Sequence, residues 1–280
     1  MTLADLVLHT KVRQRLENYS RQPTHALLLI GEKGVGLGTI ARTLAKEIAP
    51  ANVAIITPRL HDKQKTSSIN IDDIRELAEF TRDRRSDPIC VIIDEAEKMT
   101  VSAPEAFLKG LEEPVAQVFY ILTTHKPAKL PATIKSRAQT IEILPPLAEM
   151  CESLFARTEL AKGSAKLAKV KFLGDRRPAE IVRLLTDEEY FDAATALMET
   201  AKHFIQGDPA KRLSIVANCT TRDEAILLVQ NIAKLLLLSG VAAKNSKAVA
   251  HNLHATSEVI DRLAQNGNVR MQLTYLALNI

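Results

Sequence analysis

HALLLIGEKGVGLGT, at residues 25–39, decides the fold of this chain. A short apolar run leads into a glycine-rich turn, and the turn leads into TIARTLAKEIA at 39–49, whose apolar residues recur at helical spacing. A phosphate-binding loop occupies this position, between a strand and a helix, in nucleotide-binding folds. We therefore expect an α/β fold built around this segment.

Further apolar runs alternate with helical patterns through the first half of the chain. They lie at 53–57, 89–94, 118–124 and 140–144, and a helical pattern, SINIDDIRELAEFTR, lies at 68–82 with a serine or asparagine able to cap its first turn. Continuous apolar runs are typical of strands that are covered on both faces, as in a parallel sheet between helices. The pattern predicts a doubly wound α/β domain.

The strand pattern stops at Pro145-Pro146, and the rest of the chain is predicted to be helical. Gly174 and the Gly207-Asp208-Pro209 turn divide this helical half, and no repeat of fixed period is evident. We expect an α/β domain at 1–146, a small helical domain at 147–187 and a helical bundle at 188–280.

The composition is that of an ordinary soluble globular protein, with 46% apolar and 25% charged residues among 280. A net charge of +4 is too small to predict nucleic-acid binding without a clustered patch. The three cysteines form no C-x-x-C pair, which argues against a zinc site or a disulfide framework and fits a reducing compartment.

Membrane and export signals are absent from the pattern. The N-terminus lacks the charged start, apolar run and cleavage site of a signal peptide, and the apolar stretch at 225–240 is interrupted by Gln230, Asn231 and Lys234. We expect a cytoplasmic protein with no membrane partner and a buried helix at 225–240.

The glycine-rich turn departs from a working phosphate loop. Gly31 and Gly36 match G-x-x-x-x-G-K-S/T, with Gly34 between them, but Leu37 and Gly38 stand where the pattern requires lysine and a hydroxyl. That lysine neutralises the β- and γ-phosphates and the hydroxyl holds Mg²⁺, so hydrolysis should be severely impaired.

Two interpretations of the loop remain open from the residues alone. Backbone N–H groups between the glycines could still bind nucleotide weakly, or the turn could have no ligand. A dinucleotide site is disfavoured, because Thr39 stands where it needs a third glycine and no acid ends the second strand.

CVIIDEAEKMT is a buried strand that ends in an acidic pair, Asp94 and Glu95, as in a Walker B segment. In a working site the aspartate supports Mg²⁺ and the glutamate polarises the attacking water. The alternative is that one of the two carboxylates caps the following helix. Because Leu37 replaces the loop lysine, we favour a structural role over active chemistry.

Several motifs, in this order and spacing, resemble those of bacterial DNA polymerase III clamp-loader subunits of the AAA+ superfamily, with a delta-prime-like character. They cover nearly the whole first half and are THALLLIGEKGVG, INIDDIRELAEF, VIIDEAEKMT, AFLKGLEEP and ILTTHKPAKLPATIKSRAQTIEILPP. The resemblance implies an AAA+ core, a small helical lid and a C-terminal helical collar through which such subunits form a ring.

The resemblance also implies roles for individual residues. Thr123 or Thr124 falls at the sensor-1 position, and Ser136 and Arg137 match the serine-arginine-cysteine motif, with Ala138 in place of the cysteine. In the family this arginine is a finger that reaches a neighbouring subunit's ATP site, where its charge stabilises the transferring phosphoryl group. The alternative for Arg137 is a surface arginine paired with a helix or an acid.

GDRRPAEIVRLL is similar to the family's sensor-2 helix, with Arg177 at a position that faces either a phosphate or a domain interface; we favour the interface. The chain departs from the family in lacking the four-cysteine zinc module, in whose place ITPRLHDKQKTSSIN stands. The altered loop favours a delta-prime-like subunit over an ATP-hydrolysing gamma or tau subunit.

Basic residues near the acidic pair are candidates for contact with DNA phosphates, although a solvated charge run is the alternative. They are Lys98, Arg82, Arg84 and Arg85.

Together these features predict a non-hydrolysing subunit of the clamp loader that loads the sliding clamp onto primed DNA. Its expected partners are gamma/tau and delta subunits, the clamp and primed DNA, with ATP and Mg²⁺ bound by the partner subunits and little or no nucleotide in this chain. The alternatives are an active gamma/tau-like ATPase and a DNA-binding scaffold without a part in ATP turnover.

Overall fold

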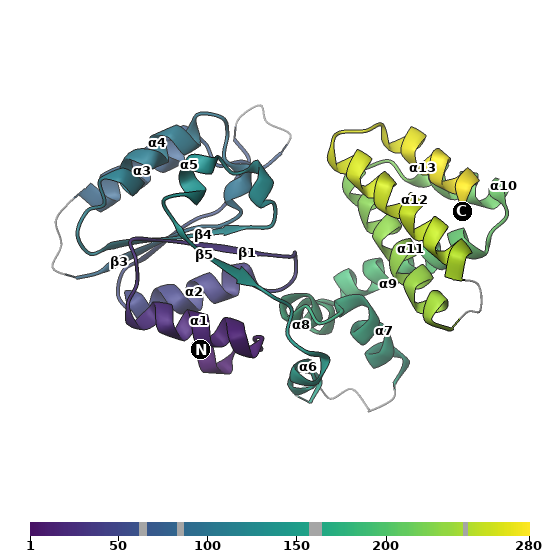
Figure 1. Cartoon of the computed structure of the whole chain (residues 1–280), viewed down its shortest axis with the longest axis horizontal. Helices are drawn as coiled ribbons and strands as arrows, with labels where there is room; N and C mark the ends of the chain where they lie inside the picture. The colour runs from purple at the N-terminus through teal and green to yellow at the C-terminus, as the bar shows by residue number, and fades with distance from the viewer. Residues whose placement is uncertain (62–65, 83–86, 157–163, 243–245) are drawn as a thin grey trace. The chain divides into compact units, whose positions relative to one another are not determined.

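A computed structural model describes residues 1–61, 66–82, 87–156, 164–242 and 246–280 (Figure 1). The chain forms two compact units, Met1–Thr186 and Asp187–Ile280. Unit 1 contains both the sheet and the helices of residues 147–186. The finer division of unit 1 at residue 146 stays a prediction.

Unit 1 is built on a five-stranded sheet with the order β2-β3-β4-β1-β5, in which every neighbouring pair is parallel. This confirms the predicted α/β class, and each strand lies within one or two residues of an apolar run in the sequence. The strands are β1 (Ala26–Gly31), β2 (Val53–Ile56), β3 (Ile89–Ile93), β4 (Val118–Thr124) and β5 (Gln139–Ile143).

Helices cover both faces of the sheet because successive strand residues point to opposite sides. Leu27 and Leu29 join one core cluster with α1 (Thr10–Arg21) and α2 (Leu37–Ile48), whereas Leu28 joins the other. The second cluster includes residues of the three helices on the opposite face in Figure 1, which are α3 (Ile71–Arg82), α4 (Ala103–Glu112) and α5 (Ala132–Lys135).

The carboxyl ends of all five strands meet at one edge of the sheet, since the strands are parallel. The glycine-rich loop follows β1, the acidic pair follows β3 and Thr124 ends β4. In open α/β sheets, ligands bind outside this edge. The fold therefore gathers the predicted site residues of three strands in one place.

After β5, the described residues of unit 1 form α6 (Ala148–Phe155), α7 (Ala165–Gly174) and α8 (Pro178–Thr186). Gly174, at the end of α7, packs so closely on Ile181 of α8 that a Cβ atom would clash with it. The two helices therefore form a tight pair.

Unit 2 is entirely helical in the residues described. Its elements are α9 (Glu188–Gln206), α10 (Pro209–Asn218), α11 (Arg222–Ala242), α12 (Ser246–Ala264) and α13 (Val269–Asn279). Asp187, Asp208 and Asn268 each cap a helix by accepting a backbone hydrogen bond, as these residue types favour. Arg212 donates to the main-chain oxygens of Phe204, Ala277 and Ile280, which joins the ends of α9 and α13.

No helix among the described residues is long and apolar enough to cross a membrane. The stretch at 225–240 belongs to α11, and Leu228, Val229 and Ile232 are fully buried in unit 2. Leu227, Leu237 and Leu238 are 50%, 54% and 56% exposed, so the prediction of a buried helix holds for one face only. All three cysteines are free thiols.

Candidate functional site

The glycine-rich loop turns sharply between β1 and α2. Gly34 and Gly36 have positive φ angles of 91° and 97°, a region that residues with a Cβ atom rarely adopt. The loop therefore needs glycine at both positions for its own conformation, whether or not it holds a ligand.

Leu37 and Gly38 give this loop a different chemistry from a phosphate-binding loop. Leu37 begins α2 and is only 2% exposed, packed in the core cluster beneath the sheet. A Cβ atom at Gly38 would lie 3.1 Å from both Asp94 Oδ2 and Arg42 Nη1, so the absence of a side chain lets these two groups lie beside the first turn of α2. Thr39, two residues into α2, is half-buried.

Helix α8 docks directly on this loop. The Gly34 carbonyl accepts hydrogen bonds from the backbone N–H groups of Ala179, at 2.9 Å, and Glu180, at 3.1 Å. Amides in the first turn of a helix are the groups that bind anions in many phosphate sites. Here a carbonyl of the chain's own loop already occupies two of them.

Arg177 strengthens the contact between the loop and α8. Its guanidinium donates to the Leu173 carbonyl at 2.7 Å and to the Gly174 carbonyl at 3.2 Å, both at the end of α7, and to the Lys33 carbonyl at 3.4 Å. Its contacts are thus with backbone carbonyls of α7 and of the loop, which agrees with the interface interpretation favoured above.

Asp94 is held by two groups at the edge of the sheet. Thr123, which is fully buried, donates its hydroxyl to Asp94 Oδ1 at 2.6 Å and accepts the Glu95 backbone N–H at 2.9 Å. Arg42 lies 3.8 Å from the other carboxylate oxygen. Arg42 was not among the predicted site residues, because its position on α2 carries no motif.

Glu95 does not cap the following helix through its side chain. It precedes a short 3-10 helix, Ala96–Lys98, without a side-chain capping bond, and its carboxylate pairs with Lys98 at 2.7 Å. Its backbone is left-handed, with φ of 51°, which is uncommon for a residue with a side chain. Capping by Glu95, one of the interpretations of the acidic pair, is therefore wrong.

The loop after β4 contributes His125, which the sequence did not single out. Its ring Nδ1 lies 2.8 Å from the Gly31 carbonyl, while its backbone N–H donates to Glu97 at 3.2 Å. Thr124 is buried and accepts the Lys126 backbone N–H at 3.1 Å. Of the two sensor-1 candidates, Thr123 is the one whose hydroxyl contacts the acidic pair.

Arg137 lies at a different corner of unit 1, where α4 and α5 end. Its guanidinium forms an ion pair with Glu112 at 2.8 Å and donates to the Thr133 carbonyl at 3.2 Å and the Ser136 hydroxyl at 3.4 Å. The Arg137 side chain is 36% exposed. Its pairing with an acid is the alternative that the sequence left open, and Glu112 was not a predicted site residue.

Of the residues predicted to contact DNA, only Lys98 has a described side chain. Lys98 is half-exposed and paired with Glu95. Arg84 and Arg85, and the side chain of Arg82, lie outside the described residues.

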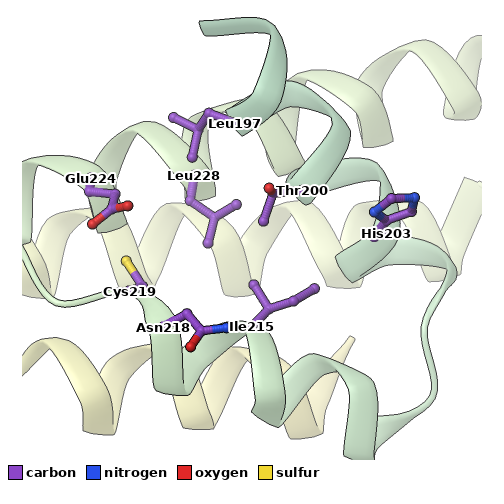
Figure 2. A pocket seen from close by; sticks show the side chains of 8 residues that line it. All are labelled: Leu197, Thr200, His203, Ile215, Asn218, Cys219, Glu224 and Leu228. Carbon is purple, nitrogen blue, oxygen red and sulfur yellow. The ribbon is translucent and has the colours of Figure 1, made fainter. Parts of the chain in front are cut away.

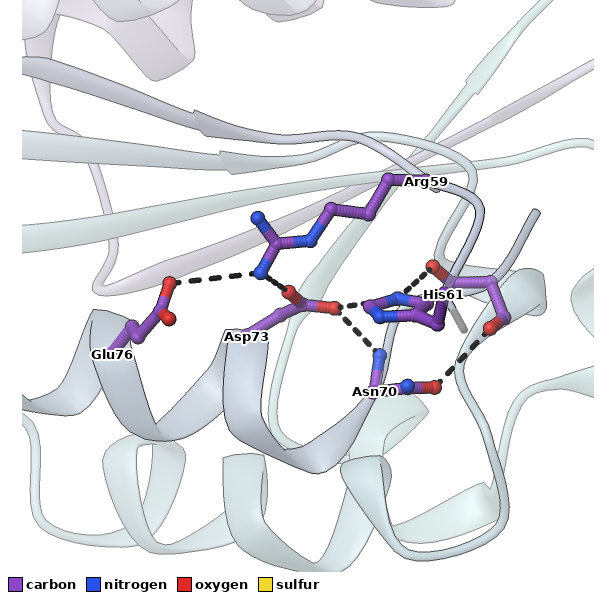
Figure 3. A network of polar contacts seen from close by, with 6 residues as sticks. Arg59, His61, Asn70, Asp73 and Glu76 are labelled. Atoms are coloured by element: carbon purple, nitrogen blue, oxygen red, sulfur yellow. Dashed lines mark hydrogen bonds and ion pairs between the residues drawn. The ribbon is translucent and has the colours of Figure 1, made fainter. Parts of the chain in front are cut away.

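The described parts of the segment that stands in place of a zinc module, on either side of residues 62–65, contact Asp73 (Figure 3). Asp73 of α3 is only 5% exposed and contacts both Arg59 and His61, the latter at 3.3 Å. It also accepts the Asn70 backbone N–H at 2.7 Å. A buried carboxylate with these partners joins the segment after β2 to the start of α3.

Unit 2 contains a cavity of about 280 Å³ between α9, α10 and α11 (Figure 2). Burial raises the pKa of the Cys219 thiol on its wall to about 11, so this thiol is protonated and weakly nucleophilic at neutral pH. The cavity is lined by Leu197, Thr200, His203, Ile215, Asn218, Cys219, Glu224 and Leu228.

Part of the chain is similar in sequence to subunits of bacterial DNA polymerase III. The family model described as "DNA polymerase III, delta subunit" matches residues 50–146. DNA polymerase III subunit tau of Bacillus subtilis is 29% identical over 159 residues, which are 49% of this chain and 28% of the relative. Subunit delta' of Pseudomonas aeruginosa is 29% identical over 137 residues, which are 41% of this chain and 42% of the relative.

Solved structures share the fold across most of the chain. A DNA polymerase III gamma subunit-related protein of Thermotoga maritima superposes with a TM-score of 0.59 and 20% identity, covering 94% of this chain and 97% of that one. RuvB of Thermotoga maritima, a Holliday junction branch migration motor, superposes with a TM-score of 0.51 and 16% identity, covering 78% and 83%. The alignments with the curated relatives span less than half of each relative's length.

Proposed function

We propose, from the relationship of this chain to the AAA+ clamp-loader subunits of bacterial DNA polymerase III, that it is a non-hydrolysing subunit of a clamp loader. In this role it supplies Arg137 to the ATP site of a neighbouring subunit and helps the assembly to load a sliding clamp onto primed DNA. The observation that carries the proposal is the loop after β1, which has Leu37 in place of lysine and is bonded to α8. The same unit keeps the half-exposed Arg137 elsewhere.

The loop lacks the groups that hydrolysis requires. Leu37 is buried where a lysine would meet the phosphates, and the Gly34 carbonyl occupies the first amides of α8. While α8 stays docked, its Ala179 and Glu180 amides are therefore taken by the loop carbonyl and are not open to a phosphate. We propose that this chain binds nucleotide weakly or not at all, and that ATP and Mg²⁺ are bound by partner subunits.

Arg137 has the chemistry of a group that acts on another subunit's nucleotide. A guanidinium is always charged and matches the geometry of phosphate oxygens. The Arg137 side chain is 36% exposed, so it is accessible at the surface of unit 1. In other phosphoryl-transfer systems such arginines contribute about 10³ to 10⁵ in rate.

Unit 2 has a surface suited to association. Met271, Tyr275 and Leu278 lie at i, i+4 and i+7 on α13 and are 63%, 37% and 60% exposed, which forms an apolar stripe on one side of the helix. Exposed apolar patches of this kind are typical of protein interfaces. We propose that unit 2 contributes to the collar of the assembly, with gamma/tau and delta subunits as partners.

The same proposal includes contact with DNA by Lys98, Arg82, Arg84 and Arg85. The charge of Lys98 is balanced by Glu95 in the isolated chain. A contact with the DNA backbone would therefore have to replace this ion pair and would depend strongly on salt.

The decisive experiment is reconstitution with the ATP-hydrolysing subunits of the same clamp loader. Arg137→Ala should lower ATP turnover and clamp loading at least 100-fold at the partner site that it serves, without preventing assembly. Arg75→Ala is the matched control, because Arg75 is also an exposed arginine in an ion pair, with Asp72 at 3.1 Å. Normal turnover with Arg137→Ala would reject the finger role and leave a scaffold.

A second experiment tests the inert loop directly. Calorimetric titration of the isolated chain with Mg-ATP should give no tight binding, and the same titration of a Leu37→Lys, Gly38→Thr variant measures what the missing groups contribute. Tight binding by the unmodified chain, with turnover that Glu95→Gln abolishes, would instead support an active ATPase.

A further inference from the structure

The ion pair between Glu112 and Arg137 joins two helix ends. Glu112 is the last residue of α4, and Arg137 lies two residues beyond the end of α5. Glu112 Oε1 and Arg137 Nη2 are 2.8 Å apart, and Arg137 Nη1 donates to the Thr133 carbonyl at 3.2 Å. Both terminal nitrogens of the guanidinium thus have partners within the chain.

Glu112 occupies an unfavourable position for an acid. The carboxyl end of a helix carries partial negative charge, which disfavours a carboxylate there and favours a cation. The Arg137 guanidinium supplies the cation to the Glu112 carboxylate and also donates to the Thr133 carbonyl of α5, which accepts the Ser136 hydroxyl as well, at 3.0 Å. The electrostatics of both helix ends therefore hold Arg137 where it lies.

A carboxylate and a phosphate compete for the same N–H groups, because both bind the guanidinium fork through two oxygens. We propose that Glu112 is a latch for Arg137. It holds the guanidinium against α4 and α5 until the phosphates of a neighbouring subunit's ATP replace the carboxylate. This inference rests on the finger role of Arg137 proposed above and makes Glu112 a positioning residue.

The exposure of the pair is what makes the latch reversible. The side chains of Glu112 and Arg137 are 51% and 36% exposed, so water can solvate both groups when the pair opens. Exposed ion pairs of ordinary strength shift a two-state population by about 1.5- to 5-fold. The pair between Arg59 and Asp73 is different, because opening it would leave a carboxylate of only 5% exposure buried without its cation, which is costly.

The latch predicts a gain of activity. In the reconstituted complex at low salt, Glu112→Gln, which keeps the side-chain shape and removes the charge, should raise the partner's ATP turnover by about 1.5- to 5-fold. Glu113→Gln is the matched control: it removes the same charge from the adjacent residue, which is also exposed. The gain should shrink toward none as salt is raised, because salt screens an exposed ion pair.

A double-mutant cycle separates this inference from the proposed function. Glu112→Gln should have no effect in the Arg137→Ala background, since the latch acts only through the arginine. If Arg137→Ala lowers turnover but Glu112→Gln does not raise it, or raises it no more than Glu113→Gln, the latch is rejected and the finger role stands. If Arg137→Ala leaves turnover unchanged, both are rejected.

Discussion

The two polar regions of unit 1 are built in opposite ways. At the loop after β1, the contacts include backbone bonds from α8 to Gly34 and the bond from the fully buried Thr123 hydroxyl to Asp94, beside the more exposed Arg177 and Arg42 side chains. At the corner of α4 and α5, Arg137 is held by one ion pair with the exposed Glu112 and by hydrogen bonds to Thr133 and Ser136, all of them at the surface. The first region therefore depends on backbone groups and a buried hydroxyl, and the second on the exposed guanidinium of Arg137 and its surface partners.

This difference indicates which region can change during function. Breaking a buried hydrogen bond leaves its partners unsatisfied and costs about 1 to 3 kcal/mol for each group. Breaking an exposed ion pair costs about 0 to 1 kcal/mol, because water replaces the partner. We therefore expect the loop region to resist substitution and the Arg137 corner to tolerate it in stability while responding in activity.

The largest effect is expected for Gly34→Ala. A Cβ atom there would lie 2.9 Å from the Cβ of Glu180, and φ is 91°, so the change combines backbone strain with a clash against α8. We expect a loss of about 3 kcal/mol in the free energy of unfolding of unit 1, measured by urea denaturation.

Gly36→Ala is its control, because φ is 97° there but the added Cβ lies 3.6 Å from Ala179, an ordinary contact. The control should cost only the strain of about 1 to 2 kcal/mol. Hydrogen exchange at Ala179 and Glu180 should speed up in Gly34→Ala alone. Equal losses in the two variants would mean that the contact between the loop and α8 contributes little.

The next effect is expected for Thr123→Val. The change removes the hydroxyl that donates to Asp94 and accepts the Glu95 N–H, which leaves two polar groups without this partner. We expect a loss of about 2 kcal/mol by the same denaturation assay. Thr124→Val, at an equally buried threonine that accepts one bond from Lys126, should lose about 1 kcal/mol or less; a reversed order would contradict the role given to Thr123.

Alkaline pH tests the strand that carries the acidic pair. Burial raises the pKa of the Cys90 thiol in β3 from 9.0 to about 12, so the folded state keeps the proton while the unfolded state loses it. The contribution of Cys90 is therefore intact below pH 9 and is lost as pH rises from about 9 to about 12.

Linkage gives roughly 1.4 kcal/mol of lost stability from Cys90 between pH 8 and pH 10. Cys90→Ala should reduce the difference between the unfolding free energies at these two pH values by that amount. An unchanged difference would show that the thiol is not the group responsible.

The smallest effect is expected for Glu112→Gln. Loss of this exposed pair should change the free energy of unfolding by less than about 1 kcal/mol, and Glu113→Gln by less still. A loss of several kcal/mol would make the Arg137 corner as fixed as the loop and would remove the distinction between the two regions.

The sheet could be predicted from the sequence because its signals are local. Apolar runs of four to seven residues between helical patterns mark each strand, and parallel pairing follows from burial on both faces. The position of the loop after the first strand, and the gathering of the acidic pair and Thr123 at its edge, follow from the same parallel order. The residue types at positions 37 and 38, Leu37 and Gly38, were enough to show that the loop lacks the lysine and the hydroxyl.

The partners of the predicted residues could not be read from local patterns. Arg177 meets the Lys33 carbonyl across 144 positions of the chain. Arg42 lies in no motif and His125 lies in one that gave it no role, yet they contact Asp94 and Gly31. Glu112 also stands in a quoted motif without any signal that it would face Arg137 rather than solvent. Such contacts depend on how the helices dock, and the spacing of residues along the chain does not predict this.

The amino-acid sequence by itself determined the parallel sheet, the all-helical second half, and the absence of lysine and hydroxyl from the loop, because each depends on residue type and short-range spacing. Only the tertiary structure decided that α8 docks on the loop and that Glu112 pairs with Arg137. Hydrogen bonds and ion pairs form only between groups that packing brings to about 3 Å. The packing of Gly174 on Ile181 and of α4 beside α5 decides which groups these are.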